Sequence, residues 1–212
     1  MIIEENTERY MRALLDRHDD AVLLEMEAHA AEHGFPIVNR HAGVTLEILA
    51  RLKGAQRICE LGSGYGYSGY WFARSGAQEI HLTDGDPENA AKAKGYLTRA
   101  GLWDKITFHV GDAVTAMGTL DGVFDIVYCD IDKGDYPAAW RAAASRIRVG
   151  GLWICDNVLW SGRVAADTIT DDVRPGWTEA IREMNTLIAS DERFISSIIP
   201  IRDGLFVALR LS

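Results

Sequence analysis

From Arg57 onward, short apolar runs alternate with stretches of helical length and pattern. The predicted strands are Arg57–Leu61, Glu79–Thr83, Lys105–Val110, Val123–Cys129 and Leu152–Cys155, and the predicted helices are Tyr67–Ser75, Pro87–Ala100, Ala113–Leu120, Tyr136–Arg148 and Asp172–Ala189. Because a helix that connects two strands of one sheet makes those strands parallel, the chain is expected to form a parallel sheet. The alternation therefore predicts an α/β protein with a doubly wound sheet and helices on both of its faces.

The two ends of the chain depart from this alternation. Residues 1–53 have apolar positions at helical spacing, and Gly34 followed by Pro36 predicts the end of a helix. At the other end, the predicted strands Phe194–Ile199 and Leu205–Leu211 are separated only by Pro200–Gly204, so we expect them to pair antiparallel. The sequence predicts a single domain with a helical cap (1–53) and a Rossmann-like, seven-stranded, mostly parallel core (54–212).

Composition narrows the class of protein. With 212 residues and 48% hydrophobic residues, the chain can bury a substantial core. The net charge of −9 argues against a broad nucleic-acid-binding surface. No apolar run approaches the roughly 20 residues that span a bilayer, and the start is acidic, so a cytoplasmic location is expected. Cys59, Cys129 and Cys155 each fall within a predicted strand, which predicts buried thiols.

Polar residues follow two predicted strands at the point where each strand ends. Asp130 follows one apolar run, and Asp156 with Asn157 follows the next. Neighbouring parallel strands lie about 4.8 Å apart, so their carboxyl ends should bring the three side chains together. Hard oxygen ligands of this kind suit Mg²⁺ or a similar divalent cation. The alternative is that these residues only cap the loops that follow.

A glycine-rich loop, Glu60 to Gly69, joins the first strand to a helix. Gly64, Gly66 and Gly69 match the G-x-G-x-x-G pattern, and Asp84 ends the next strand, which would support an NAD-dependent oxidoreductase. However, the carboxylate of Glu60 would repel a pyrophosphate and attract a cationic amino group. S-adenosylmethionine has an amino group and no phosphate, so we favour it as the cofactor.

These residues together resemble the cation-dependent class I O-methyltransferases, the group of animal catechol and plant caffeoyl-CoA O-methyltransferases. The resemblance runs from about residue 21 to the C-terminus and is carried by Glu60-Leu61-Gly62, Gly66-Tyr67-Ser68, Asp84, Asp130-Ile131-Asp132-Lys133, Tyr136, the segment 156–162 and Asp203-Gly204. One position departs from the family, since Arg202 stands before Asp203-Gly204 where relatives usually carry glycine.

The resemblance implies a role for each matching residue. Asp130, Asp156 and Asn157 match the divalent-cation ligands, and Lys133 matches the proposed general base. Asp84 matches an acid that binds the ribose, Asp112 and Ala113 match an adenine contact, and Asp112 is also a candidate helix N-cap. The predicted cofactor-binding residues are Val38, Glu60, Gly62, Gly64, Ser68, Asp84, Asp112, Ala113 and Asp130.

The identity of the methyl acceptor stays open at this point. The leading hypothesis is a small catechol-like aromatic, with Trp160 and His41 as candidate contacts near an irregular segment, Val158 to Pro175. An alternative is 5-hydroxyuridine in tRNA, because residues 27–43 look like the bacterial branch that methylates it. That alternative requires a basic patch, for which the candidates are Arg9, Arg12, Arg40, Lys53 and Arg163. Relatives are often dimers, which implies a homodimer.

Overall fold

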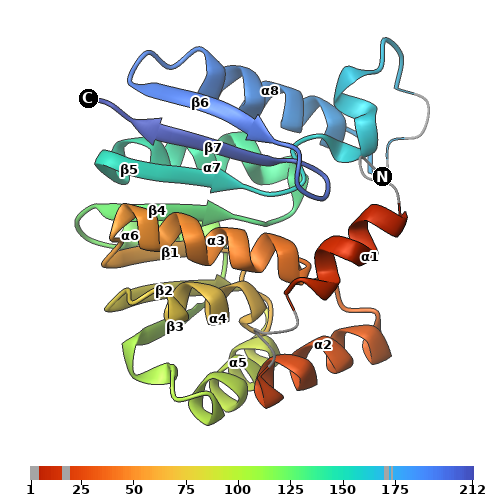
Figure 1. Cartoon of the computed structure of the whole chain (residues 1–212). Helices are drawn as coiled ribbons and strands as arrows, with labels where there is room; N and C mark the ends of the chain where they lie inside the picture. Colours follow the sequence, from red (N-terminus) through yellow and green to blue (C-terminus); the bar gives the residue numbers. More distant parts are fainter. Residues whose placement is uncertain (1–4, 16–19, 170–171, 173) are drawn as a thin grey trace.

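The structure, a computed structural model, has a seven-stranded sheet at its centre (Figure 1). The strand order is β3-β2-β1-β4-β5-β7-β6. The strands are β1 (Arg57–Leu61), β2 (Glu79–Asp84), β3 (Ile106–Val110), β4 (Phe124–Cys129), β5 (Ile147–Cys155), β6 (Phe194–Ile199) and β7 (Leu205–Arg210). The first five strands are parallel, whereas β7 pairs antiparallel with both β5 and β6. The predicted fold class is therefore confirmed. The structure describes all residues except 1–4, 16–19, 170, 171 and 173.

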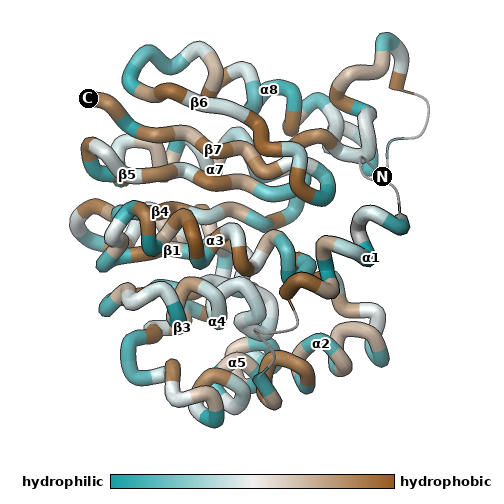
Figure 2. The backbone as a smooth tube through the Cα atoms, in the orientation of Figure 1, coloured by the Kyte–Doolittle hydropathy of each residue, from teal (hydrophilic) through white to brown (hydrophobic). Residues whose placement is uncertain are grey.

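Helices cover both faces of this sheet. They are α1 (Glu5–Ala13), α2 (Ala21–His33), α3 (Arg40–Lys53), α4 (Tyr67–Arg74), α5 (Pro87–Arg99), α6 (Ala113–Thr119), α7 (Tyr136–Ala143) and α8 (Trp177–Ala189). Residues of α2 to α5 form one buried cluster with one face of the sheet, and residues of α6 to α8 form a second cluster with the other face. Hydrophobic stretches recur along the strands that lie between these layers (Figure 2).

The N-terminal helices begin and end where local chemistry allows. Asp20 caps α2 by accepting a hydrogen bond from the backbone N–H of Val22 at 2.9 Å. Gly34 ends α2 in the left-handed conformation, with φ of 62°, as its position before Pro36 predicts. The chain then runs without regular structure to Asn39, which caps α3. This short connection, residues 35–38, brings the cap over the edge of the sheet where the strands end.

Several element boundaries differ from the prediction. The helix expected over Tyr136–Arg148 stops at Ala143, and β5 begins at Ile147, five residues before the predicted start. A Cβ atom at Gly151 would lie 2.9 Å from the carbonyl oxygen of Asp125, so only glycine allows the backbone of β5 this close to β4. From the sequence, the Gly150-Gly151 pair is predicted to be a stop between the helix and the strand, but in the structure it lies within β5. The last helix is also shorter than predicted, since α8 begins at Trp177.

The order of the strands determines where a ligand can bind. The chain adds strands on one side of β1 and then returns to place β4 on the other side, so the crevice lies at the carboxyl ends of β1 and β4. Cys59, Cys129 and Cys155 are buried, free thiols, as predicted. Within the described ranges, no helix is both long and apolar enough to cross a membrane.

Candidate active site

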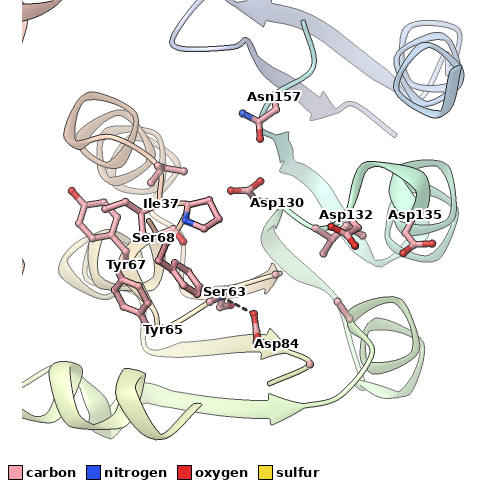
Figure 3. A pocket seen from close by; sticks show the side chains of 18 of the residues that line it. Ile37, Ser63, Tyr65, Tyr67, Ser68, Asp84, Asp130, Asp132, Asp135 and Asn157 are labelled. Carbon is pink, nitrogen blue, oxygen red and sulfur yellow. Dashed lines mark hydrogen bonds between the residues drawn. The ribbon is translucent and has the colours of Figure 1, made fainter. Parts of the chain in front are cut away.

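A cavity of about 510 Å³ opens at this crevice (Figure 3). Its wall is formed by the glycine-rich loop, the ends of β2 and β4, the start of α6 and the segment 35–38. The predicted site residues that line it are Val38, Gly62, Gly64, Ser68, Asp84, Asp112, Ala113, Asp130, Lys133 and Asn157. Four other predicted residues, Glu60, Asp156, Trp160 and His41, are outside this wall.

The glycine-rich loop has the tight geometry that its sequence predicts. Gly62 and Gly64 have φ of 81° and 49°, in the left-handed region that favours glycine. A Cβ atom at Gly62 would lie 2.3 Å from the carbonyl oxygen of Asp130, so the loop passes directly over the end of β4. The loop is therefore close enough for its backbone to contact a ligand in the cavity.

Asp84 holds the loop from the neighbouring strand. Its Oδ2 accepts a hydrogen bond from the backbone N–H of Gly64 at 2.9 Å. Its Oδ1 accepts from the side chain of Asn89 at 3.0 Å and from the N–H of Asp86 at 2.9 Å. A carboxylate has about four acceptor positions, so Asp84 still has capacity to accept from a ribose hydroxyl.

Glu60 lies beneath the loop and is fully buried. One carboxyl oxygen accepts a hydrogen bond from the hydroxyl of Ser68. The other, Oε2, is buried and has no hydrogen-bond partner among the described residues. Burial raises the pKa of Glu60 to about 8, and the hydrogen bond from Ser68 opposes this rise. Glu60 thus supports the loop from below and is linked to the cavity through Ser68, which lines it.

Asp112 performs the capping role that the sequence allowed. Its Oδ1 accepts from the N–H of Thr115 at 2.7 Å at the start of α6, and the hydrogen bonds from Thr115 lower the pKa of Asp112. Asp112 and Ala113 also line the cavity. The two roles are compatible, because the first turn of α6 forms the cavity wall.

The acidic residues at the strand ends come together as predicted. Cys129 pairs with Cys155 across β4 and β5, so Asp130 and Asp156 follow directly from neighbouring strands. Figure 3 shows Asp130 and Asn157 extending from these strand ends toward the cavity, with Asp84 on its opposite side. Asp156 is buried, and burial followed by the nearby charge of Asp130 raises its pKa to about 6. Asn157 has a φ of 58°.

Lys133 lies beside these acids. Its Nζ donates to Oδ1 of Asp130 and to the carbonyl oxygen of Ile131, each at 3.2 Å. The ammonium also lies 5.1 Å from the centre of the Tyr136 ring. Lys133 is buried, so its stem is fixed and its amino group is held at the cavity wall.

Arg202 is a member of the site that motif reasoning missed. It follows β6 in the turn to β7, and its Nη1 forms an ion pair with Oδ2 of Asp156. Its φ of 52° lies in the left-handed region, which explains why glycine suits this position. The sequence carried one signal, an arginine where the resemblance predicts glycine, but the pairing joins residues 46 positions apart.

The two predicted acceptor contacts lie elsewhere. Trp160 is in a short 3-10 helix (Trp160–Ala165), where its ring lies 5.7 Å from the ring of Trp177. Trp160 therefore packs this segment against the start of α8. His41 is in the first turn of α3 and does not line the cavity. Of the irregular segment predicted over 158–175, residues 170, 171 and 173 lie outside the described residues.

Comparison with known proteins shows which family this chain belongs to. Residues 16–211 match a protein family described as O-methyltransferase. The chain belongs to the O-methyltransferase family. It is 30% identical to a catechol O-methyltransferase from Niastella koreensis over 220 residues, which cover 98% of this chain and 97% of that protein.

Solved structures of family members have the same fold. The O-methyltransferase TomG from Streptomyces achromogenes, solved in complex with S-adenosylmethionine, is 28% identical, with a TM-score of 0.83 and coverage of 92% of this chain and 91% of that one. An O-methyltransferase from Bacillus cereus, solved with S-adenosylhomocysteine, is 25% identical with a TM-score of 0.83, covering 93% of this chain and 96% of that one. The predicted enzyme class, an S-adenosylmethionine-dependent O-methyltransferase, is confirmed, and the alternative of an NAD-dependent oxidoreductase is set aside.

Proposed function

We propose that this enzyme transfers the methyl group of S-adenosylmethionine to a hydroxyl of a small catechol-like aromatic, with a divalent cation bound at the acidic edge. The observation that carries the proposal is the continuity of the cavity. The glycine-rich loop and Asp84 line one part of it, and Asp130, Lys133 and Asn157 line another part. A methyl donor and a polar acceptor bound in the two parts would therefore be neighbours.

The residues on the cofactor side suit S-adenosylmethionine. Asp84 has acceptor capacity for the ribose hydroxyls, and Ala113 offers an apolar surface at the cavity wall for the adenine ring. The methionine end would lie near Gly62 and Ser68, where the loop allows close approach. Val38, from the segment 35–38, would cover the apolar part of the cofactor.

The donor set at the acidic edge fits a divalent cation. Asp130 and Asp156 provide carboxylate oxygens, and Asn157 provides a neutral amide oxygen. A positively charged group, the guanidinium of Arg202, is already paired with Asp156, which supports the affinity of this edge for a cation. Within the described ranges, no group of three or more His, Cys, Asp or Glu side chains forms a metal site, and the proposed set has two carboxylates and one amide. A cation bound there would lower the pKa of a coordinated acceptor hydroxyl.

The transfer itself is an in-line displacement. The acceptor hydroxyl loses its proton, and its oxygen forms a bond to the methyl carbon of the sulfonium. The bond between this carbon and sulfur breaks, and its electron pair stays on sulfur in neutral S-adenosylhomocysteine. We assign Lys133 to accept the acceptor's proton at Nζ in its neutral amine form, after its ammonium has released a proton to solvent, because this atom is held at the cavity wall beside Asp130. The segment 35–38 would exclude water from the reacting atoms.

The test is methyl transfer from labelled S-adenosylmethionine to 3,4-dihydroxybenzoate, with Mg²⁺ and with EDTA. We expect turnover that EDTA abolishes, and a loss of about 100-fold or more in Asp156→Asn, in the range for removing a group that stabilises developing charge. Asp104→Asn is the matched control, because Asp104 is exposed and outside the cavity. Turnover that is indifferent to both EDTA and Asp156→Asn would contradict the cation site.

The tRNA acceptor stays a prediction. The basic patch that it requires is less well supported than the acidic edge of the cavity. Arg40 is buried, and Arg40 and Arg12 both pair with Glu27, at 2.8 and 3.1 Å. Two of the five candidate basic residues thus share one carboxylate, and one of the two is buried. A parallel assay with tRNA that carries 5-hydroxyuridine distinguishes the acceptors. The homodimer and the cytoplasmic location stay predictions from the sequence.

A further inference from the structure

We infer that Arg202 is a built-in competitor of the divalent cation, so that a metal ion binds the acidic edge only when the guanidinium leaves Asp156. The inference rests on the cation site of the proposed function and concerns its regulation by a residue of this chain. It is carried by the position of the turn, by the occupied oxygens of Asp156 and by the balance of charge at the site.

The turn that carries Arg202 is held firmly beside the acidic edge. Strand β7 pairs antiparallel with β5, so the turn before β7 lies next to the end of β5. The carbonyl oxygens of Asp203 and Gly204 accept hydrogen bonds from the N–H groups of Leu159 at 2.8 Å and Val158 at 3.2 Å. The carboxylate of Asp203 accepts a third from the N–H of Ser161 at 2.6 Å. These hydrogen bonds therefore hold the backbone of residue 202 beside the acidic edge.

Both carboxylate oxygens of Asp156 have partners in this arrangement. Oδ2 is paired with Nη1 of Arg202, and Oδ1 accepts from the N–H of Asn157 at 2.9 Å. The side chain of Asp156 is only 1% exposed, whereas that of Arg202 is 25% exposed and lines the cavity. Oδ2 of Asp156, which a cation would bind, is thus covered by the guanidinium of Arg202. The cavity beside Arg202 gives this guanidinium space into which it can move.

The charges of the two ion pairs at the acidic edge, Lys133 with Asp130 and Arg202 with Asp156, balance each other. The carboxylates of Asp130 and Asp156 carry two negative charges, and the side chains of Lys133 and Arg202 that pair with them carry two positive charges. A divalent ion added to this arrangement would meet two like charges within the same small volume, and in a partly buried site their repulsion is only weakly screened. With Arg202 displaced, one negative charge is left uncompensated and binding becomes favourable.

Arg202 is also linked to the wall of the cofactor side. Its Nη2 donates to the carbonyl oxygen of Ile37 at 3.4 Å, and Ile37 belongs to the segment 35–38 that lines the cavity. Displacement of the guanidinium therefore removes a contact between the acidic edge and this segment.

The test is titration of the full-length enzyme with Mn²⁺, with the free ion followed by electron paramagnetic resonance in the absence of S-adenosylmethionine and acceptor. We expect weak binding by the wild-type enzyme and a Kd lower by about tenfold or more in Arg202→Met, which keeps a long side chain without the charge. Arg202→Gly should behave in the same way, and its backbone is relieved of the left-handed strain at φ of 52°.

The matched control is Arg141→Met, which makes the same change in net charge at an exposed ion pair with Glu183, outside the cavity. Its Kd for Mn²⁺ should equal that of the wild type. Equal Kd values for wild type, Arg202→Met and Arg202→Gly would overturn the competition and leave the cation site standing. Absence of Mn²⁺ binding in every variant would overturn both. Failure of the enzyme to methylate a catechol would refute the proposed acceptor without changing this titration.

Discussion

Glu60 is a buried acid whose protonation should control the stability of the enzyme without cofactor. Its pKa rises from an ordinary value of 4.5 to about 8 in the folded state, mainly because burial disfavours the carboxylate. Between these two values the unfolded chain has lost the proton and the folded chain keeps it. The free energy of unfolding should therefore fall as pH rises from 4.5 to about 8, and this contribution should level off above pH 8.

The size of this effect follows from the interval between the two pKa values. At about 1.36 kcal/mol for each pH unit, the interval corresponds to a loss of about 5 kcal/mol. Glu60→Gln keeps the shape of the side chain and cannot ionise. From pH 5 to pH 8, the free energy of unfolding of wild type should therefore fall by several kcal/mol relative to that of Glu60→Gln.

The assay is urea unfolding of both proteins at half-unit steps of pH, followed by circular dichroism without S-adenosylmethionine. Ser68→Ala provides a second check, because the Ser68 hydroxyl donates a hydrogen bond that lowers the pKa of Glu60. Its loss should extend the falling part of the stability curve to higher pH. A difference between Glu60→Gln and wild type that is flat from pH 5 to pH 8 would refute the reasoning.

Two further predictions concern glycines. Gly62→Ala should lower the free energy of unfolding by about 2–5 kcal/mol, because it combines left-handed strain with a Cβ atom that meets the backbone of Asp130. Gly54→Ala, with φ of 61° and nothing within 4 Å of its Cβ, should cost only about 1–2 kcal/mol in the same urea assay, and equal losses would refute the clash. Gly95→Ala, at an exposed position within α5 with open space around its Cβ, should instead raise the melting temperature through a gain of about 0.5–1 kcal/mol, and a lower melting temperature would contradict this.

Much of the fold can be predicted from the sequence because its signals are local. The apolar runs predict β1 and β6 with the bounds that the structure has, and the short connection before β7 predicts its antiparallel pairing. The residues that follow β4 and β5 come together because parallel neighbours end at the same edge of the sheet. Local patterns failed at β5, where the glycine pair suggested a break. Its need for glycine comes from the backbone of β4, which is distant in sequence.

The arrangement of charges in the site was decided by the tertiary structure alone. The sequence determined that Glu60 precedes the loop, but only packing shows that its carboxyl lies beneath Ser68 and is buried there. From the sequence, Arg40 is a candidate for a basic patch near the cavity, whereas the fold buries it against Glu27. The pairing of Arg202 with Asp156 depends on β7 lying beside β5, which brings together two positions 46 residues apart. Whether a charge is solvated, buried or paired depends on its neighbours in space, and these are set by the packing of the whole chain.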